Sequence, residues 1–322
     1  MRYRTLGKTG IEVSEIGYGA WGIGGRQWLG GTDDGSLLAL KRAIELGLNF
    51  IDTALAYGEG HSERLVGQVV KETGAKVYLA TKVPPKNRIW PAQPDIGIEE
   101  VFPASYVIES TETSLRNLGV ETLDLQQLHV WNPAWLASDE WRKAFETLKK
   151  SGKVRFVGIS INDHQPDSAL ELVKTGLIDT VQVIYNIFDP TPQKHLFPLC
   201  QAHNVGVLAR VPLDEGSLTG SITEATEFEP QEFRAMYFRG DRKKEVVTHV
   251  SALQADLGDT GESLAETALR FCISHPALSS VIPGMRQIRN VESNMGVSAR
   301  GPLSEAVLAT LARHAWAKNF YN

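Results

Sequence analysis

Asn49-Phe50-Ile51-Asp52-Thr53-Ala54-Leu55-Ala56-Tyr57-Gly58 is the stretch of sequence that decides the fold. It follows a run of helical periodicity, Ser36–Leu46, which ends at Gly47. Its apolar first half therefore predicts a buried strand after a helix, and Asp52 falls near the carboxyl end of that strand. Tyr57 follows on the next loop. In a barrel of parallel strands this end is the functional face, because the loops that lead to the helices gather there.

Two later strands also end in side chains that can carry chemistry. Residues Lys76–Val83 form an apolar, β-branched run in which Lys82 comes just before the chain breaker Pro84-Pro85. Residues Leu123–Val130 end in the same manner with His129. A nearby cation is what lowers the pKa of a tyrosine from its usual value of about 10. The sequence therefore predicts a carboxylate, a phenol, an amine and an imidazole around one barrel mouth.

Strand-like and helix-like segments alternate along the rest of the chain, which is the pattern of a parallel α/β sheet. About eight such units favour a closed (β/α)8 TIM barrel over an open sheet. An N-terminal β-hairpin is expected at residues 3–6 and 12–15, and the barrel strands at 16–20, 50–53, 77–82, 123–129, 156–159, 180–185, 206–209 and 280–282. Further helices are expected at 106–118, 141–149 and 264–274, and a long, polar functional loop at 219–242.

The length and composition describe one globular unit. No linker divides the 322 residues, so we expect a single domain over residues 1–322. The hydrophobic fraction of 42% and the charged fraction of 22% are typical of a soluble protein. A net charge of −5 argues against a general surface for nucleic acid or membrane. No apolar run approaches the ~20 residues of a membrane span and the start of the chain lacks an apolar signal segment, so a cytoplasmic location is expected.

Two short motifs match other oxidoreductase classes, and their context argues against both. Gly17-Tyr18-Gly19-Ala20-Trp21-Gly22 fits the dinucleotide fingerprint G-x-G-x-x-G, but a Gly-rich loop follows where that fingerprint needs a helix. Tyr78 and Lys82 fit the Y-x-x-x-K pair of short-chain dehydrogenases. On a strand these two residues stand about 13 Å apart, whereas a helix would bring them to about 6 Å. Tyr57 rather than Tyr78 is therefore the expected acid.

The cysteines and the other histidines indicate no metal or redox chemistry. Cys200 and Cys272 lie in apolar surroundings, and we expect them to be core residues rather than a disulfide or redox pair. The chain contains neither H-E-x-x-H nor H-x-H, so no metal site is expected.

The stretch around Asp52 resembles the signature of the aldo-keto reductases. The match runs as Ile51-Asp52-Thr53-Ala54-x-x-Tyr57-Gly58-x-x-x-Ser62-Glu63-x-x-Val66-Gly67, and the strand-end Lys82 and His129 fit the same family. A similar stretch begins at Arg4-x-Leu6-Gly7, so the resemblance covers nearly the whole chain. It implies a (β/α)8 barrel that binds NADP(H) and reduces an aldehyde or ketone by direct hydride transfer.

The resemblance also implies the catalytic roles. Tyr57 would protonate the carbonyl oxygen of a small-molecule substrate. Lys82, held by Asp52, would stabilise the tyrosinate and lower the Tyr57 pKa. His129 would orient and polarise the carbonyl. Trp21, Trp90 and Trp131 are the candidates for an apolar substrate wall, although large aromatic residues often serve packing alone.

A nicotinamide site is implied by three further segments. Asp52 and the turn Gly19, Ala20 and Trp21 would line the cleft. Ser160 and Asn162 end the strand that binds the carboxamide, with Gln182 completing the contact. The intervening Ile161 leaves open whether Asn162 or a rearranged contact serves here.

The same resemblance assigns the phosphates of the cofactor. The loop that crosses the pyrophosphate would contain Arg210, Pro212, Leu213, Gly216, Ser217 and Leu218, and Arg210 would either stack on the nicotinamide or contact phosphate. The adenosine end would lie at a helix start that contains Gly284, Arg286, Asn290 and Asn294. Arg286 is the candidate for the 2′-phosphate, and helix capping is the competing role for these polar residues.

Two rival functions stay open at the level of sequence. The chemistry is reversible, so a sugar or pyridoxal dehydrogenase that works in the oxidative direction has the same residues. Related barrels also serve as cofactor-binding auxiliary subunits of membrane channels. The complete set of Asp52, Tyr57, Lys82 and His129 argues for an enzyme.

Overall fold

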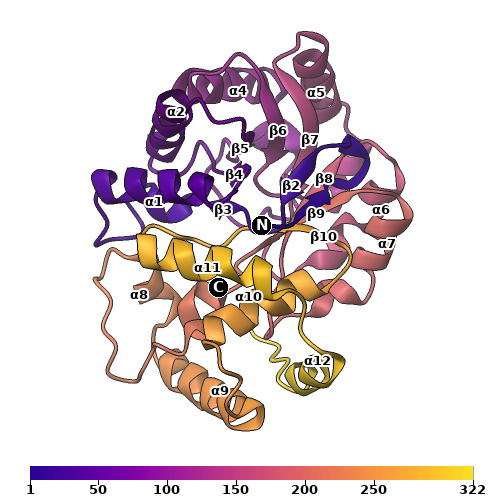
Figure 1. Cartoon of the computed structure of the whole chain (residues 1–322). Coiled ribbons are helices and arrows are strands. Elements are labelled where there is room, and N and C mark those ends of the chain that lie inside the picture. Colours follow the sequence, from indigo (N-terminus) through magenta and orange to yellow (C-terminus); the bar gives the residue numbers. More distant parts are fainter. Residues whose placement is uncertain (322) are drawn as a thin grey trace.

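Eight parallel strands form the centre of the computed structural model, which describes residues 1–321 (Figure 1). In sheet order they are β3 (Tyr18–Gly19), β4 (Phe50–Asp52), β5 (Tyr78–Val83), β6 (Leu123–Leu128), β7 (Val154–Ser160), β8 (Thr180–Ile184), β9 (Gly206–Arg210) and β10 (Leu278–Val281). The two outer strands meet, because Gly17 N donates to Val281 O at 2.8 Å and Gly19 N to Pro283 O at 3.0 Å. The predicted (β/α)8 barrel is confirmed.

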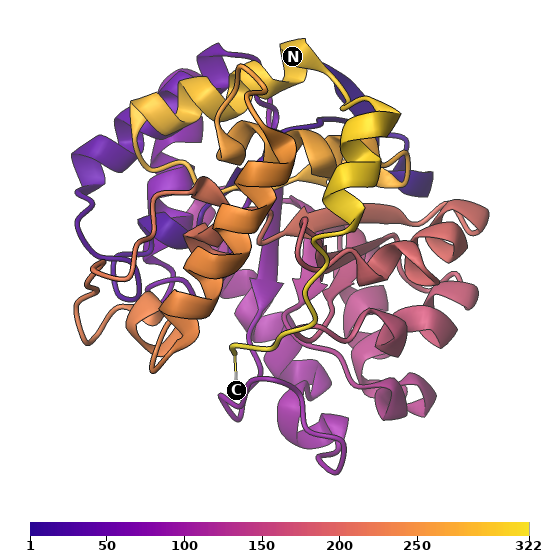
Figure 2. The ribbon, with the colours of Figure 1, turned by 90° about the horizontal axis from the view of Figure 1, so that it is seen from below.

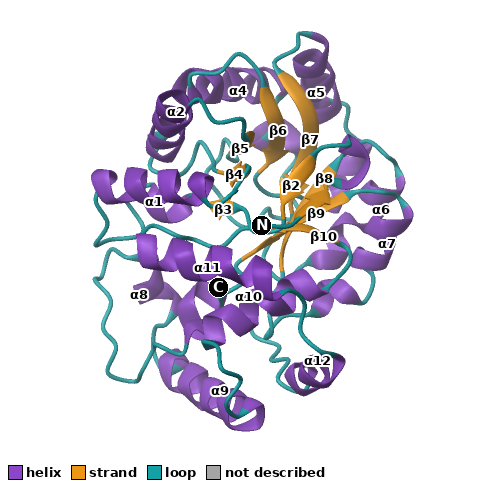
Figure 3. Ribbon diagram, in the orientation of Figure 1, coloured by secondary structure: helices purple, strands orange, loops and turns teal. Residues whose placement is uncertain are grey.

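Helices surround this sheet on the outside (Figure 3). The ring consists of α1 (Asp33–Glu45), α2 (His61–Thr73), α4 (Ala104–Leu118), α5 (Glu140–Lys150), α6 (Leu170–Lys174), α7 (Leu196–Ala202), α10 (Leu264–Ser274) and α11 (Ile288–Arg300). Each amphipathic helix turns one face inward; α5, for example, buries Trp141, Ala144, Phe145 and Leu148, at the spacing of an apolar helical stripe. Additional helices are α3 (Ile98–Val101), α8 (Phe233–Tyr237), α9 (Arg242–Leu257) and α12 (Glu305–Ala312).

The N-terminal hairpin fills one end of the barrel. Its strands β1 (Tyr3–Thr5) and β2 (Glu12–Ser14) are antiparallel, as predicted. Side chains of the hairpin join a separate core cluster with residues of the barrel strands, formed by Leu6, Ile11, Val13, Phe50, Ala80, Leu125, Leu208 and Ile282. Gly7 has a φ of +51°, and a Cβ there would lie 2.2 Å from the backbone nitrogen of Gly206. Only glycine permits this close approach at the start of β9.

The two misleading motifs are resolved by the local structure. After β3 only a 3-10 turn, Trp21–Ile23, precedes the first helix at Asp33, so no helix follows the G-x-G-x-x-G sequence. Tyr78 begins β5 and packs against the hairpin cluster, whereas Lys82 lies near the other end of that strand. The Y-x-x-x-K pair therefore does not form a site.

Other sequence expectations differ from the structure in detail. Residues 219–242, expected to be a polar loop, contain α8 as well, because Phe233 packs against Trp21 and Tyr237 is buried against Tyr321. Cys200 and Cys272 are buried and free, as expected. Among the described residues, no helix combines the length and the apolar character that crossing a membrane would need.

Candidate active site

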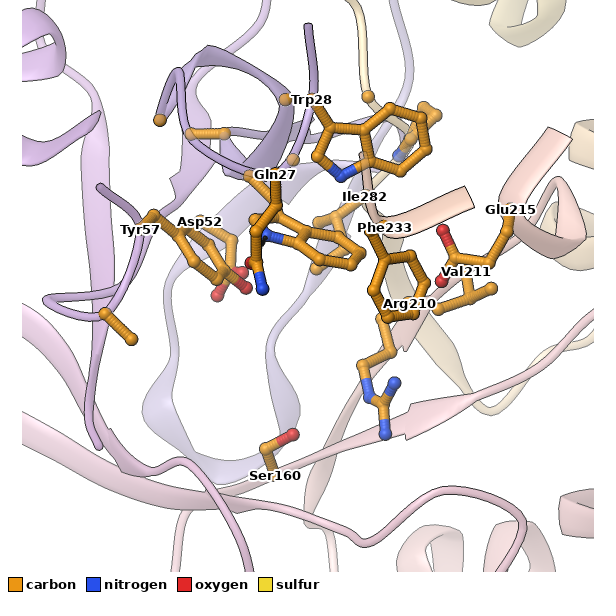
Figure 4. A pocket seen from close by; sticks show the side chains of 18 of the residues that line it. Gln27, Trp28, Asp52, Tyr57, Ser160, Arg210, Val211, Glu215, Phe233 and Ile282 are labelled. Atoms are coloured by element: carbon orange, nitrogen blue, oxygen red, sulfur yellow. Dashed lines mark hydrogen bonds between the residues drawn. The ribbon is translucent and has the colours of Figure 1, made fainter. Parts of the chain in front are cut away.

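A cavity of about 800 Å³ opens at the carboxyl ends of the barrel strands. Figure 4 shows Asp52 and Tyr57 on one side of it and Arg210 and Glu215 on the other. Most of the residues predicted from the sequence line this cavity: Gly19, Ala20, Trp21, Asp52, Tyr57, Trp90, His129, Ser160, Asn162, Gln182, Arg210, Pro212, Leu213, Gly216, Gly284, Arg286 and Asn290. Segments that are far apart in the sequence thus meet at the carboxyl ends of the strands, where the site was predicted.

The Lys82 ammonium is the centre of the predicted catalytic group. Its Nζ forms a short ion pair with Asp52 and donates to the carbonyl oxygen of Thr53 at 2.9 Å. The same Nζ lies 3.3 Å from the Tyr57 hydroxyl oxygen. The His129 ring stands edge-on to the Tyr57 ring, with centroids 5.7 Å apart. Lys82 is fully buried, and its ammonium contacts the hydroxyl of Tyr57, which lines the cavity.

Asp52 is held from the other side by two glutamine amides. Gln127 Nε2 donates to Asp52 Oδ2 at 3.1 Å, and Gln182 Nε2 donates to the same oxygen at 2.9 Å. These bonds leave Oδ1 for Lys82. Gln127 is a residue that the sequence analysis missed, although an amide two positions before His129 within an apolar strand was a signal. Gln182 contacts the catalytic carboxylate as well as lining the cavity, which extends its predicted role.

Electrostatics set the protonation states of the group. Burial disfavours the charged form of Lys82, but Asp52 and Tyr57 outweigh it and raise the Lys82 pKa. Burial raises the pKa of Tyr57, and Lys82 acts in the opposite direction without reversing the shift. The expectation that Lys82 brings the Tyr57 pKa below its ordinary value is therefore wrong for the protein alone, because desolvation is the larger effect. Tyr57 remains a protonated phenol at neutral pH.

His129 is neutral over the physiological range. Burial, helped by the charges of Lys82 and Arg210, lowers its pKa well below the ordinary value. A neutral imidazole still carries one N–H that can donate to a carbonyl oxygen. The arrangement can thus hold a carbonyl oxygen between two neutral donors, Tyr57 and His129.

We predict that carbonyl reduction keeps its rate as the pH falls from about 7 to about 5.5, across the range in which an ordinary histidine gains its proton. The rate should stay constant because the pKa of His129 is lowered, so its imidazole stays neutral at pH values where an ordinary histidine is already protonated. The measurement is kcat/KM for an aldehyde substrate at constant NADPH saturation. A loss of activity with a midpoint near pH 6.5 that disappears in His129→Gln would contradict the prediction.

Arg286 provides the clearest indication of an anion. Its guanidinium Nη1 is buried and has no hydrogen-bond partner in the described structure. Burial and the neighbouring charge of Arg234 lower the pKa of Arg286. Gly22 and Gly31 leave room beside the guanidinium, since a Cβ at Gly31 would lie 3.4 Å from Nη1. A buried guanidinium nitrogen with no partner is costly, and a phosphate group would satisfy it.

Arg210 is already paired within the protein. Its Nη2 donates to Asp163 Oδ1 at 2.6 Å and to the Ile161 carbonyl oxygen at 3.0 Å. Asp163 balances the charge of this guanidinium, whose plane can stack on a flat ring. The Nε of Arg210 is buried without a hydrogen-bond partner among the described residues. Asn162 bonds to the backbone of Ala92 through both ends of its amide, so it holds the segment that carries Trp90.

The sequence model of the Aldo/keto reductase family matches residues 15–315, that is, nearly the whole chain. This chain belongs to the aldo-keto reductase family. The aldo-keto reductase YhdN of Bacillus subtilis (strain 168) is 31% identical to it, over 91% of this chain and 87% of that protein. Members of this family are oxidoreductases that bind a nicotinamide cofactor.

Two further similar proteins differ in the cofactor that their names state. The NADH-specific methylglyoxal reductase of Escherichia coli (strain K12) is 28% identical, over 92% of this chain and 93% of that protein. The structure of an aldo-keto reductase from Klebsiella pneumoniae in complex with NADPH has a TM-score of 0.71 and 25% identity, over 99% of this chain and 98% of that one. The choice between the two cofactors must therefore be argued from the residues of this aldo-keto reductase itself.

Some predicted residues do not reach the cavity. Trp131 is fully buried and packs edge-on against Trp135 and Trp141, with ring centroids 6.1 Å and 5.5 Å away. Its predicted place in a substrate wall is wrong, because its ring is buried among these tryptophans and does not line the cavity. Ser217, Leu218 and Asn294 are buried and do not line the cavity. Ser217 Oγ is nevertheless buried without a partner.

Other cavity residues were not predicted from the sequence. Gln27 Oε1 accepts a hydrogen bond from Trp21 Nε1 at 3.0 Å, and Phe233 stands edge-on to Trp21 at 4.9 Å between centroids. Arg234 approaches from the segment after Thr219, and Tyr321 lines the cavity from the far end of the chain. These segments lack a periodic pattern, so only the folded structure reveals that they converge here.

Proposed function

We propose that this aldo-keto reductase reduces the carbonyl group of an aldehyde or ketone with NADPH, with Tyr57 as the general acid. The observation that carries the proposal is the buried Lys82 ammonium, which contacts both Asp52 and the Tyr57 hydroxyl at the wall of the cavity. A structural ion pair would not need a phenol that faces a cavity, whereas proton transfer to a substrate does.

A nicotinamide cofactor held here by residues such as Gln182 and Arg286 would supply a hydride for the carbonyl carbon. The carbonyl oxygen gains the electron pair of the former C=O π bond, and Tyr57 donates its hydroxyl proton to that oxygen, which completes the alcohol. Lys82 stabilises the tyrosinate that remains, and Asp52 keeps Lys82 charged and in place. Neutral His129 donates a hydrogen bond that orients the carbonyl before transfer. Stabilisation of charge in a site removed from water is the usual source of a large rate enhancement.

Aromatic side chains indicate the class of substrate. Trp21, Trp90 and Phe233 line the cavity next to Tyr57 and His129. The Trp90 ring stands edge-on to His129, with centroids 5.9 Å apart. Such a wall favours an aromatic or otherwise apolar carbonyl compound, because flat apolar groups bury well against aromatic faces.

The test is whether the purified protein oxidises NADPH in the presence of a simple aromatic aldehyde such as benzaldehyde. We expect steady oxidation that requires both reactants. A protein that binds NADPH but never turns over would support the rival role of a cofactor-binding regulatory subunit. Reduction of NADP+ with sugars or pyridoxal at neutral pH, without reduction of any aldehyde, would favour the hypothesis of a dehydrogenase.

Arg286 decides the choice of cofactor in this proposal. We expect Arg286→Ala to raise the dissociation constant for NADPH about tenfold or more, because a charge-assisted bond to the 2′-phosphate contributes roughly 1.5–3 kcal/mol. NADH offers no phosphate at that position, so its dissociation constant should hardly change. Both constants can be measured by quenching of the protein fluorescence.

The matched control is Arg289→Ala, which removes an exposed arginine three residues further on that does not line the cavity. We expect Arg289→Ala to leave both constants unchanged. Equal weakening of NADPH and NADH by Arg286→Ala, or a wild-type preference for NADH, would show that Arg286 only supports the start of α11.

A further inference from the structure

The C-terminal tail, residues 313–321, folds back onto the barrel and ends at the cavity. Figure 2 shows it running from α12 across the face of the molecule to the C-terminus. Trp316 anchors it: its backbone N donates to Phe188 O at 2.9 Å, and its ring stacks on His249 at 3.8 Å between centroids. Arg242 Nη1 donates to Phe320 O at 2.7 Å. These contacts place Tyr321 in the cavity wall.

The tail meets two adjacent carboxylates in the loop after β9. Asp214 and Glu215 are both buried, and both have backbone φ angles in the left-handed region, 49° and 55°. Such angles are uncommon for residues with a side chain and need surrounding contacts to hold them. Under the proposed function this loop borders the diphosphate of the cofactor. Two negative charges there would repel a polyanion.

Each of these carboxylates has a partner in the tail. Lys318 Nζ pairs with Asp214 Oδ2 at 2.6 Å, and both side chains are nearly inaccessible, at 4% and 3%. The Tyr321 hydroxyl donates to Glu215 Oε1 at 2.7 Å. Tyr237 donates to the second oxygen of Asp214 at 3.1 Å. The tail therefore supplies one positive charge and one donor to a loop that would otherwise be anionic.

The surroundings of both acids agree with a neutral loop. Aromatic rings enclose the Lys318 ammonium, with the Trp316 and Phe320 centroids 4.3 Å and 4.5 Å from Nζ. Burial lowers the Lys318 pKa and Asp214 counteracts the shift. Burial also raises the Glu215 pKa to about 7; Asp214 and Asp163 add to this shift, while Tyr321 and Arg210 oppose it.

We propose that the C-terminal tail is a cofactor-positioning element, in which Lys318 neutralises the Asp214 carboxylate and Tyr321 donates a hydrogen bond to Glu215, so that this loop can border the diphosphate of a dinucleotide. The inference rests on the proposed function for the identity of the anion. It assigns Lys318 a role that depends on its charge. If the tail had only a structural role, cofactor affinity would depend on whether the contact between Lys318 and Asp214 forms and not on the charge of Lys318.

The test compares the two halves of the same ion pair. Lys318→Met leaves the Asp214 carboxylate without its cation and so with an unbalanced negative charge near the diphosphate, and we expect the NADPH dissociation constant to rise about tenfold. Asp214→Asn leaves Lys318 unpaired, so we expect that constant to stay the same or fall. Both variants break one buried pair, and their melting temperatures should fall by similar amounts. Weakening of NADPH by both variants alike would overturn the proposal and leave the tail with only a structural role.

A second variant keeps the test decisive if Lys318→Met does not fold. The double variant Asp214→Asn/Lys318→Met restores charge balance, and we expect it to bind NADPH with nearly the wild-type constant. A large loss of NADPH affinity in this folded double variant would overturn the proposal. The titration of the wild-type protein separates the two hypotheses. If the wild-type protein binds neither NADPH nor NADH, the proposed function itself fails. If it binds NADPH and the Lys318 variants bind equally well, only the proposed role of the tail is refuted.

Discussion

Replacing Tyr57 by Phe is expected to lower the turnover of aldehyde reduction by roughly 100-fold or more, which is the contribution of general acid catalysis. Phe keeps the aromatic ring that packs near Trp21, at 6.2 Å between centroids, and removes only the hydroxyl that faces Lys82. The dissociation constant for NADPH should therefore change little. Steady-state kinetics with a cofactor titration separates the two effects.

Tyr78→Phe is the matched control for this prediction. Tyr78 lies on the same strand as Lys82 but packs against the N-terminal hairpin, so its hydroxyl has no access to the cavity. We expect Tyr78→Phe to keep nearly the wild-type turnover. The opposite pattern, with Tyr57→Phe active and Tyr78→Phe inactive, would mean that the acid has been assigned to the wrong tyrosine.

Lys82→Met should affect both turnover and stability. It leaves the Asp52 carboxylate buried without its cation, and breaking such a pair costs about 3–5 kcal/mol in the free energy of unfolding. It also removes the main effect that opposes the burial of the Tyr57 phenol, so the tyrosinate formed during reduction loses most of its stabilisation. Turnover is expected to fall by roughly 100-fold or more. Urea unfolding and steady-state kinetics measure the two quantities.

Asp52→Asn should reproduce part of this loss, because the Lys82 ammonium keeps the Thr53 carbonyl and Tyr57 as partners. The double variant Asp52→Asn/Lys82→Met should be less damaging than the product of the two single effects, since the residues act as one unit. Lys76→Met, an exposed lysine just before the same strand, is the control and should leave turnover and stability unchanged. Independent, multiplicative losses would argue that Asp52 and Lys82 do not work through one contact.

The sequence predicted the catalytic side chains because each ends a strand. A parallel barrel brings such ends to one mouth, so Asp52, Lys82 and His129 could be placed together before any coordinates were known. The placement of Tyr57 needed only the short loop after Asp52. Trp131, two residues beyond His129, shows the limit of this reasoning, since the direction of a side chain outside regular structure has no periodic signal.

Residues that act through long-range contacts were not predictable in this way. Gln127 supports Asp52 only because β6 and β4, which flank β5 in the sheet, bring these two side chains together. Arg234, Phe233 and Tyr321 reach the cavity from a segment with little periodicity and from the tail, and their docking depends on tertiary packing. The sign of the Tyr57 pKa shift was also missed, because the extent of burial depends on the whole cavity wall and cannot be read from the charge of Lys82 alone.

The seam between β3 and β10 has a consequence for how this protein is made. Residues 16–19 bond to residues 281–284, so the ribosome must release nearly the entire chain before the barrel can close. Until then the growing sheet has two edges with unpaired backbone groups, and the N-terminal hairpin lacks its contacts with the last strand and the residues that follow it. Open edges of this kind promote association between chains. We expect nascent chains that stop before residue 278 to aggregate or to need a chaperone, although seven of the eight strands are already present.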